Sequence, residues 1–268
     1  MTAPQPRLLA FDIDGTLLRS DGSVSARVRG ALDAARDLGL VLSLSTGRPW
    51  PQAFGVAADA GGMDYGVCLN GAVVVDAVEG HTLALRTMTA EQGRATGRLA
   101  RDLLPDATLA ADMADGRHFW ERDFHPMFPV DVEAVRVDDA VSIVDGPVLT
   151  WLVGSPGWDP AEIITTLHDH MPPGTEVRPS GLDMAEIAAF GVSKASGLQI
   201  VADRHDIARD EVMAFGDGLN DLEMLRWAGH PVAMANGHPT VLDVARRIAP
   251  SNDDDGVAVV IEGVLASI

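Results

Sequence analysis

The sequence has a single cysteine, Cys68, among its 268 residues. One cysteine cannot form a disulfide within the chain, and it cannot supply a cysteine-rich zinc site. Because Cys68 stands in the apolar stretch YGVCLNG, we expect a small buried side chain and not a reactive thiol. The sequence therefore excludes a fold stapled by internal disulfides.

The chain is also poor in positive charge. It carries 20 Lys and Arg residues against 39 Asp and Glu residues, which gives a formal net charge of -19. A field of this sign repels nucleic-acid backbones and anionic membranes, so we expect neither as a partner. A small phosphorylated substrate would be repelled as well, unless its site supplies a metal ion or individual Lys and Arg residues.

Long apolar segments are missing too. No uninterrupted apolar run approaches the roughly 18 residues that cross a bilayer, and the first residues, MTAPQPRLLAF, do not resemble a signal peptide. We therefore expect a cytoplasmic protein. With 47% hydrophobic residues the chain can still bury a sizeable core, with room for an insert.

Short apolar runs alternate with helical patterns at both ends of the sequence. The pattern predicts strands over 7–13, 40–46, 211–217 and 231–237, and a strand, turn and strand over 65–75. It predicts helices over 25–39, 51–62, 193–207, 220–229, 239–248 and 257–268. Such alternation is typical of an α/β fold with a parallel sheet and helices on both faces.

The middle of the chain has a different order. Predicted helices over 90–104 and 161–171 are separated by strands and by the segment HFWERDFHPMFPV, without long buried parallel runs. This order suits an α+β insert whose antiparallel sheet carries helices on one side. We expect a discontinuous core of residues 1–83 and 187–268 around an insert of residues 84–186.

Two predicted strands of the core end in acids. FDID supplies Asp12 and Asp14, and AFGD supplies Asp217, which Asp221 follows. Ligands of an open parallel sheet bind beyond the carboxyl ends of its strands. Carboxylates gathered there repel one another and are costly to desolvate, and Mg²⁺ with its oxygen ligands relieves both costs.

The Asp-x-Asp-Gly spacing points to phosphoryl chemistry. Gly15 lets the chain leave strand geometry directly after Asp14, so that this carboxylate can turn back towards Asp12. One carboxylate can attack phosphorus and form an aspartyl-phosphate. Its neighbour can protonate the leaving oxygen and then activate water.

Two more segments offer groups for a phosphate. In LSTGRP, Thr46 can offer a hydroxyl, Gly47 lets backbone N–H groups approach, and Arg48 is a nearby cation. In GVSKASG, Lys194 opens a predicted helix, where the helix dipole disfavours a cation. We therefore expect Lys194 to bind an anion.

In this order, DIDGTLL, STGRP, the lysine of GVSKASG and GDGLNDLEML resemble the four motifs of the haloacid dehalogenase (HAD) superfamily. LNGAVV and SNDDDGVAVVIEGVL resemble its Cof-like, type IIB phosphatase branch. Thr46 and Lys194 are 148 positions apart, so the insert lies between them. The resemblance implies a Rossmann-like core with an inserted α+β cap of the C2B type.

The resemblance also implies a role for each motif residue. It makes Asp12 the nucleophile and Asp14 the general acid/base. Mg²⁺ would be held by Asp12, the Asp14 carbonyl, Asp217 and Asp221. The phosphoryl group would be bound by Thr46, Gly47, Lys194 and Asn220.

Residues outside these roles are candidates for substrate contacts. They are Arg48 and Asn70 in the core, and His118, Trp120 and Arg122 in the insert. For the three in the insert, packing within the cap or a dimer contact is an equally good interpretation.

The sequence thus predicts a Mg²⁺-dependent phosphatase acting on a small phosphorylated metabolite, with sugar phosphates favoured. A phosphomutase such as phosphomannomutase is an alternative, since a type IIB cap also occurs there. A non-catalytic sugar-phosphate sensor is another, although a pure binder has no need of the second acid, Asp14. The sequence does not indicate an oligomeric state.

Overall fold

The structure is a computed structural model that describes residues 4–125, 132–181 and 184–266. The chain divides into a core unit, Met1–Ala84 with Ser193–Ile268, and a cap unit, Leu85–Val192. The sequence placed the second boundary after residue 186. Strand β11 (Ala185–Ala189) spans that position and pairs with cap strands on both sides, so the chain leaves the cap unit only after this strand.

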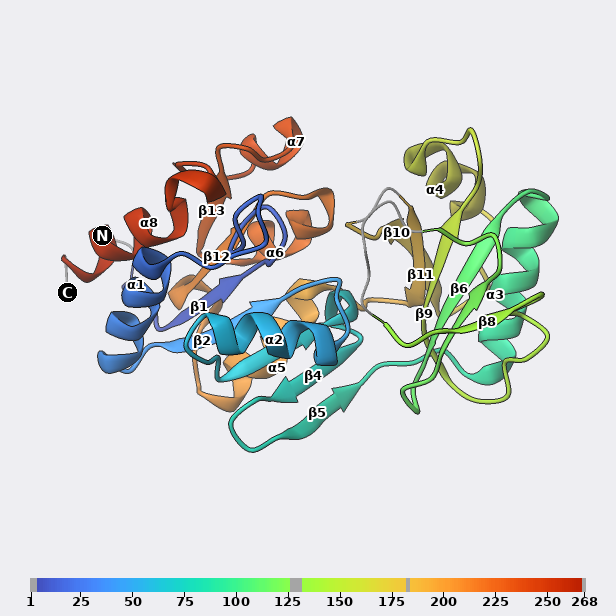
Figure 1. Ribbon diagram of the computed structural model, residues 1–268, viewed down its shortest axis with the longest axis horizontal. Coiled ribbons are helices and arrows are strands. Elements are labelled where there is room, and N and C mark those ends of the chain that lie inside the picture. The colour runs from blue at the N-terminus through green and yellow to red at the C-terminus, as the bar shows by residue number, and fades with distance from the viewer. Residues whose placement is uncertain (1–3, 126–131, 182–183, 267–268) are drawn as a thin grey trace. The chain divides into compact units, whose positions relative to one another are not determined.

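The core unit contains an eight-stranded sheet (Figure 1). In spatial order its strands are β14 (Arg247–Ala249), β13 (His230–Met234), β12 (Val212–Gly216), β1 (Leu8–Phe11), β2 (Val41–Ser45), β3 (Tyr65–Cys68), β4 (Val73–Asp76) and β5 (His81–Leu85). Neighbours from β14 to β3 pair in parallel, and β4 is antiparallel to β3. The carboxyl ends of the parallel strands therefore meet at one edge of the sheet.

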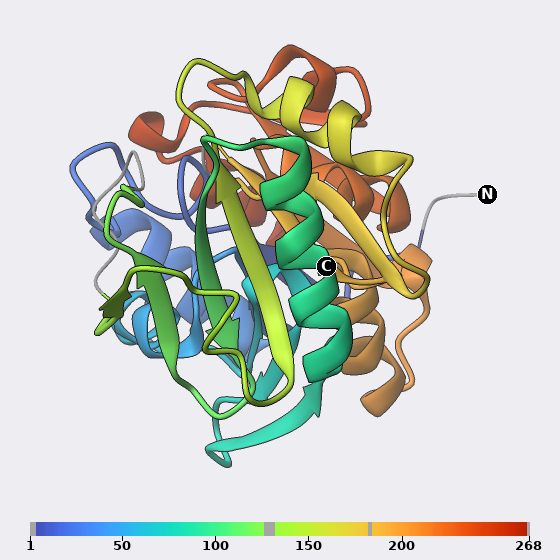
Figure 2. The same cartoon turned by 90° about the vertical axis from the view of Figure 1, so that its right-hand side faces the viewer.

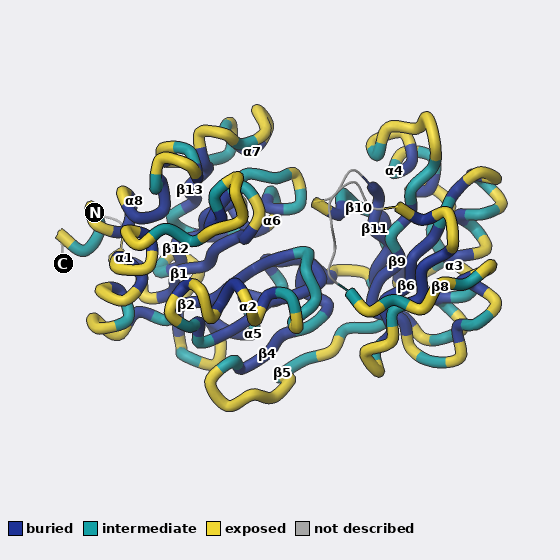
Figure 3. Tube along the Cα trace, viewed as in Figure 1, coloured by how far each residue is buried: buried dark blue, intermediate teal, exposed yellow. Residues whose placement is uncertain are grey.

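Side chains alternate across this sheet and bury an apolar layer on each face. In β1, Leu9 and Phe11 join one buried cluster, and Leu8 and Ala10 join the other. The first cluster includes residues of α1 (Ala26–Asp37), α2 (Trp50–Asp59) and α8 (Gly256–Leu265). The second includes residues of α5 (Lys194–Arg204), α6 (Leu222–Trp227) and α7 (Pro239–Leu242). Helices on both faces confirm the α/β core, and its central strands are buried (Figure 3).

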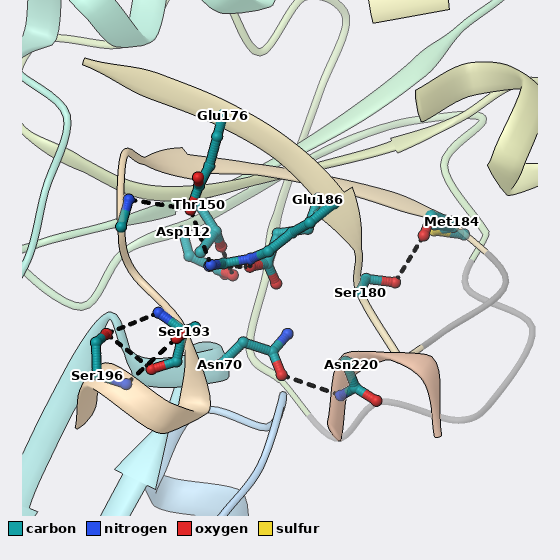
Figure 4. A network of polar contacts seen from close by, with 12 residues as sticks. Asn70, Asp112, Thr150, Glu176, Ser180, Met184, Glu186, Ser193, Ser196 and Asn220 are labelled. Carbon is teal, nitrogen blue, oxygen red and sulfur yellow. Dashed lines mark hydrogen bonds and ion pairs between the residues drawn. The ribbon is translucent and has the colours of Figure 1, made fainter. Parts of the chain in front are cut away.

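Side-chain caps determine where two of these helices begin. Ser25 accepts a hydrogen bond from the Val28 N–H at 3.0 Å at the start of α1. At the start of α5, the Ser193 hydroxyl accepts the Ser196 N–H at 3.2 Å, and the Ser196 hydroxyl accepts the Ser193 N–H at 2.9 Å (Figure 4). This capping box makes Lys194 the first residue of α5.

The helix expected over 239–248 is wrong in its second half. Helix α7 ends at Leu242, and Arg247–Ala249 instead form the edge strand β14, parallel to β13. Four short 3-10 helices also occur among the described residues: Leu69–Gly71, Arg209–Glu211, Leu219–Asp221 and Asn252–Asp254. Helical patterning is a weak signal over ten residues, and pairing with a neighbouring strand overrides it here.

The cap unit contains a six-stranded sheet with helices on one face, as the α+β pattern predicted (Figure 2). In spatial order the strands are β10 (Thr175–Pro179), β11, β9 (Val148–Gly154), β6 (Thr108–Met113), β7 (His118–Glu121) and β8 (Val135–Val137). All neighbours are antiparallel except β7 and β8. Helices α3 (Ala90–Leu103) and α4 (Pro160–His168) pack on the sheet around the fully buried Trp151, whose Nε1 donates to the Gly93 carbonyl at 3.0 Å.

In the parts of the chain that the structure describes, no helix combines the length and the apolar character needed to cross a membrane. The cytoplasmic location stays a prediction.

Candidate active site

The neighbouring strands β1 and β12 deliver acids to the same edge of the core sheet. Phe11 and Phe215 are partners in the parallel register, and the Asp12 N–H donates to the Phe215 carbonyl at 3.0 Å. Asp12 follows β1 directly, and Asp217 follows β12 directly. Together with Asp221 they form what we call the acid cluster, in which one carboxylate oxygen from each residue lies within 4.8 Å of the others.

Lys194 supplies the positive charge of the acid cluster. Its Nζ donates to Asp12 Oδ1 at 2.5 Å and to Asp221 Oδ1 at 2.6 Å, and its side chain is fully buried. Burial opposes the charge, but the two carboxylates outweigh it and raise the pKa of Lys194, so the ammonium persists. Lys194 is also the only lysine in the sequence. The local cation that a chain of net charge -19 needs is therefore present.

Asp221 holds both Lys194 and the loop after β12 in place. Its second oxygen, Oδ2, accepts the backbone N–H groups of Asp217 and Gly218, each at 2.9 Å, while Oδ1 binds Lys194. The residue is completely buried. These contacts orient Lys194 and fix the loop after β12, a role that the sequence did not reveal. The proposed role of Asp221 as a metal ligand stays a prediction.

Asp217 is the more open member of the acid cluster. The Thr16 hydroxyl donates to its Oδ1 at 2.7 Å. Gly15 has a φ of +78°, and a Cβ there would lie 2.3 Å from Asp217 Oδ2, so glycine lets the two loops approach. Burial raises the pKa of Asp217 to about 6 and also raises the pKa of Asp12 well above its usual value. Thr16 was not singled out from the sequence, although it follows the Asp-Gly pair directly.

From the sequence we expected the Asp14 carboxylate to turn back towards Asp12. In the structure it pairs with Arg48 instead. Both oxygens of its carboxylate are bound by Arg48, whose Nε donates to Oδ2 at 2.8 Å and whose Nη2 pairs with Oδ1. The Asp14 side chain is 62% exposed, whereas Asp12 is buried. The Asp14 carboxylate is attracted by the positive charge of Arg48, whereas the three carboxylates of the acid cluster would repel it.

The loop after β2 is held by the loop after β3. The Thr46 carbonyl accepts the Asn70 N–H at 2.9 Å, and the Arg48 carbonyl accepts the Leu69 N–H at 3.1 Å. The Thr46 hydroxyl accepts the Arg48 N–H at 3.1 Å, which leaves the hydroxyl hydrogen available to a phosphoryl oxygen. Gly47, between them, is partly exposed.

The Leu69-Asn70-Gly71 segment is conformationally strained. Leu69 and Asn70 have φ values of +48° and +49°, in the left-handed region that non-glycine residues seldom occupy. Gly71 has a φ of +100°, and a Cβ there would lie 2.1 Å from the Ser193 carbonyl oxygen. Asn70 Oδ1 also accepts a hydrogen bond from Asn220 Nδ2 at 3.0 Å (Figure 4). The segment therefore ties together the loops after β2 and β12 and the start of α5.

His118 belongs to a polar row on the cap sheet. Its Nδ1 lies 2.5 Å from Asp112 Oδ1. Asp112 lies beside Thr150 (Figure 4), whose hydroxyl donates to Asp112 Oδ2 at 2.8 Å. The three residues are lateral neighbours on β7, β6 and β9. Burial works against a charge on His118, but the hydrogen bond and charge of Asp112 prevail and raise its pKa.

The other two cap candidates lie in different surroundings. Trp120 is buried against Phe124, with ring centroids 5.3 Å apart, and Arg136 lies over its ring. Arg122 is largely exposed and pairs with Asp138. Substrate contacts by His118, Trp120 and Arg122 stay predictions.

A second group of possible metal ligands lies on β4, on β5 and in the turn between them, away from the predicted site. Asp76, Glu79 and His81 can each bring a ligand atom within 4.8 Å of the others. The sequence analysis did not single them out. Arg204 lies 3.6 Å from Asp76 and 3.8 Å from Glu79, so an arginine already offsets part of their negative charge.

Comparison with known proteins agrees with this architecture. A model of the haloacid dehalogenase-like hydrolases matches residues 9–261. The chain is 29% identical over 268 residues to the 5-amino-6-(5-phospho-D-ribitylamino)uracil phosphatase YitU of Bacillus subtilis, covering 95% of this chain and 96% of that protein. It is 28% identical over 242 residues to an HMP-PP phosphatase of Yersinia enterocolitica, covering 87% and 85%.

A solved structure, that of BT1666 from Bacteroides thetaiotaomicron, is described as one of the phosphatases of the HAD superfamily. It matches with a TM-score of 0.82 and 27% identity, covering 97% of this chain and 95% of that chain. Phosphatases thus recur among the relatives over nearly the full length. The chain belongs to the haloacid dehalogenase superfamily, in its Cof-like branch, and is a phosphatase of small phosphorylated metabolites.

Proposed function

We propose that this phosphatase requires Mg²⁺ and hydrolyses monophosphates of sugars or sugar alcohols through an aspartyl-phosphate on Asp12. The observation that carries the proposal is the buried Lys194, bound at once to Asp12 and Asp221. A buried ammonium between two carboxylates provides a fixed charge beside the attacking oxygen. Such preorganised charge stabilises the phosphoryl oxygens in the transition state.

The acid cluster fits a magnesium ion. Its donors are hard carboxylate oxygens, and burial, together with the neighbouring Asp221 carboxylate, raises the pKa values of Asp12 and Asp217. Asp12 and Asp217, with the Asp14 carbonyl, are the ligands we propose. Bound there, Mg²⁺ would neutralise charge on the phosphoryl group and the carboxylates.

The proposed reaction has two steps. In the first, an Asp12 carboxylate oxygen bonds to phosphorus as the ester P–O bond breaks, and Asp14 gives its proton to the leaving alcohol oxygen. In the second, water attacks phosphorus, Asp14 takes a proton from that water, and the Asp12–phosphorus bond breaks to release phosphate. Lys194 and the Thr46 hydroxyl hold the phosphoryl oxygens in both steps.

The substrate class is inferred from a relative. The name of YitU places the phosphate of its substrate on a D-ribityl group, which is a sugar alcohol chain. The chain matches that protein over nearly its whole length. We therefore favour a phosphate ester on a polyhydroxylated chain or ring.

Phosphate release from a panel of compounds tests the proposal. The panel holds sugar phosphates, sugar alcohol phosphates, pyridoxal phosphate and flavin mononucleotide, each with and without Mg²⁺. We expect release that needs Mg²⁺ and falls roughly a thousandfold or more in Asp12→Asn. Asp33→Asn, which changes an acid on α1 that pairs with Arg36, is the matched control and should keep full activity.

The rival functions have distinct signatures in the same assay. Isomerised product without net phosphate release indicates a phosphomutase. Tight binding without turnover indicates a sensor. Full activity in Asp12→Asn would contradict the aspartyl-phosphate.

A further inference from the structure

Asp14, the acid proposed to transfer protons, forms a bidentate ion pair. Arg48 engages both oxygens of Asp14, through Nε and Nη2. The hydrogen bonds that Arg48 donates to Asp14 raise the pKa of Arg48, so the guanidinium is a permanent cation. With both oxygens bound in this way, Asp14 is not free to serve a leaving oxygen or a water molecule.

Arg48 is anchored beside the phosphate-binding loop. Its backbone N–H donates to the Thr46 hydroxyl at 3.1 Å, and its carbonyl accepts the Leu69 N–H at 3.1 Å. A phosphoryl group that binds the Thr46 hydroxyl therefore arrives next to the backbone of Arg48. The long arginine side chain can then reach either Asp14 or that phosphoryl group.

The Arg48–Asp14 pair is easily exchanged. The Arg48 side chain is 32% exposed and that of Asp14 is 62% exposed. Ion pairs in such contact with water are weak. A phosphate monoester offers more negative charge than a carboxylate, and a guanidinium can bind it with two parallel hydrogen bonds. A bound phosphoryl group is thus a sufficient competitor for Arg48.

We propose that Arg48 is a positioning residue that holds Asp14 while no phosphate is bound and transfers its hydrogen bonds to the phosphoryl group when a substrate arrives. This inference rests on the proposed function, because it assumes that a phosphate enters this site. The released Asp14 carboxylate can then take up a proton from solvent and turn to the leaving oxygen as the general acid. Substrate binding itself thereby makes the general acid/base available.

The test is a double-mutant cycle read by phosphate binding. Isothermal titration calorimetry with inorganic phosphate, in Mg²⁺, is applied to the wild type, Asp14→Ala, Arg48→Met and the double variant. Asp14→Ala frees Arg48, so phosphate should bind roughly two- to fivefold more tightly, as expected for breaking an exposed ion pair. In the Arg48→Met background the same change should bring no such gain.

Matched variants separate this role from general effects. Arg27 forms an equivalent two-pronged pair with Glu262 in the core unit, so Arg27→Met should leave phosphate affinity unchanged. Arg48→Lys keeps the positive charge but cannot form two parallel hydrogen bonds. In this background Asp14→Ala should increase phosphate affinity less than it does in the wild type. If Arg48→Met binds phosphate too weakly to measure, the double-mutant cycle is carried out with Arg48→Lys in its place.

An equal gain in both backgrounds would mean that Asp14 only repels phosphate by its charge, and would overturn the proposal. If phosphatase activity is intact, that outcome leaves the proposed function standing. A wild type that neither binds nor releases phosphate would overturn both.

Discussion

At the scale of single residues, Lys194 decides the charge balance of the site. The acid cluster places three carboxylates together, and burial makes the charges of Asp12 and Asp217 costly by raising their pKa values. The ammonium, bonded to two of them, offsets this cost, and removing one partner of such a buried pair is strongly destabilising. A single lysine thus balances the charge of both Asp12, the proposed nucleophile, and Asp221.

The charge of Lys194 can be observed directly, because it is the only lysine. Protein grown with lysine labelled with ¹³C at Cε should give one side-chain resonance. We expect no titration of this signal at pH 10.5, the usual lysine pKa, because the two carboxylates raise the pKa above that value. The urea-unfolded protein is the control and should titrate normally. A folded-state titration below pH 10.5 would contradict the ion pairs.

The raised pKa of Asp217 predicts that the folding stability of the metal-free protein depends on pH. Its folded pKa of about 6 lies above the usual 3.8, so the folded state binds more protons between these values. Stability therefore falls as pH rises through this window, by linkage. Urea unfolding in EDTA at pH 4.5 and 7 should show this fall, reduced in Asp217→Asn. Mg²⁺ should stabilise the wild type more at pH 7 than at pH 4.5, because protons compete for its ligand. An equal pH response in the two proteins would refute the assignment.

At the scale of elements, the loops after the strands determine the site. Strands β1, β2, β3 and β12, which precede these loops, and helix α5 were predicted from apolar patterning, whereas the serine cap of α5 was identified in the structure. The 69–71 segment was predicted only as a turn between two strands. Its left-handed residues arise because it must contact the loops after β2 and β12 and the start of α5 at once. These contacts involve residues far apart in the sequence.

Gly71→Ala tests that close approach. An alanine at positive φ costs about 1–2 kcal/mol at any such site. At Gly71 the added Cβ also meets the Ser193 carbonyl oxygen, which should displace the start of α5 and Lys194. We expect phosphatase activity to fall about a hundredfold. Gly39→Ala is the control, because its φ is +79° and a Cβ there meets nothing within 4 Å. If the two variants kept equal activity, the contact would have no functional weight.

At the scale of the whole molecule, the two units should respond differently to Mg²⁺. The proposed ligands all lie in the core unit, and each unit has its own buried apolar cluster. A ligand stabilises the unit that binds it. Differential scanning calorimetry should therefore show two transitions, with Mg²⁺ raising the temperature of one. In Asp217→Asn that shift should shrink. A single transition that moves as a whole would show that the units unfold together.

The sequence alone determined the family, the α/β core, the α+β insert and the motif acids, because apolar periodicity and short motifs are local properties of the chain. It did not determine the edge strand β14, the partner of Asp14 or the anchoring role of Asp221. Arg48 lies 34 positions from Asp14, and Lys194 lies 182 positions from Asp12. Only the tertiary structure brings such groups together, and the balance of charge and burial at that point decides which carboxylate pairs with which cation.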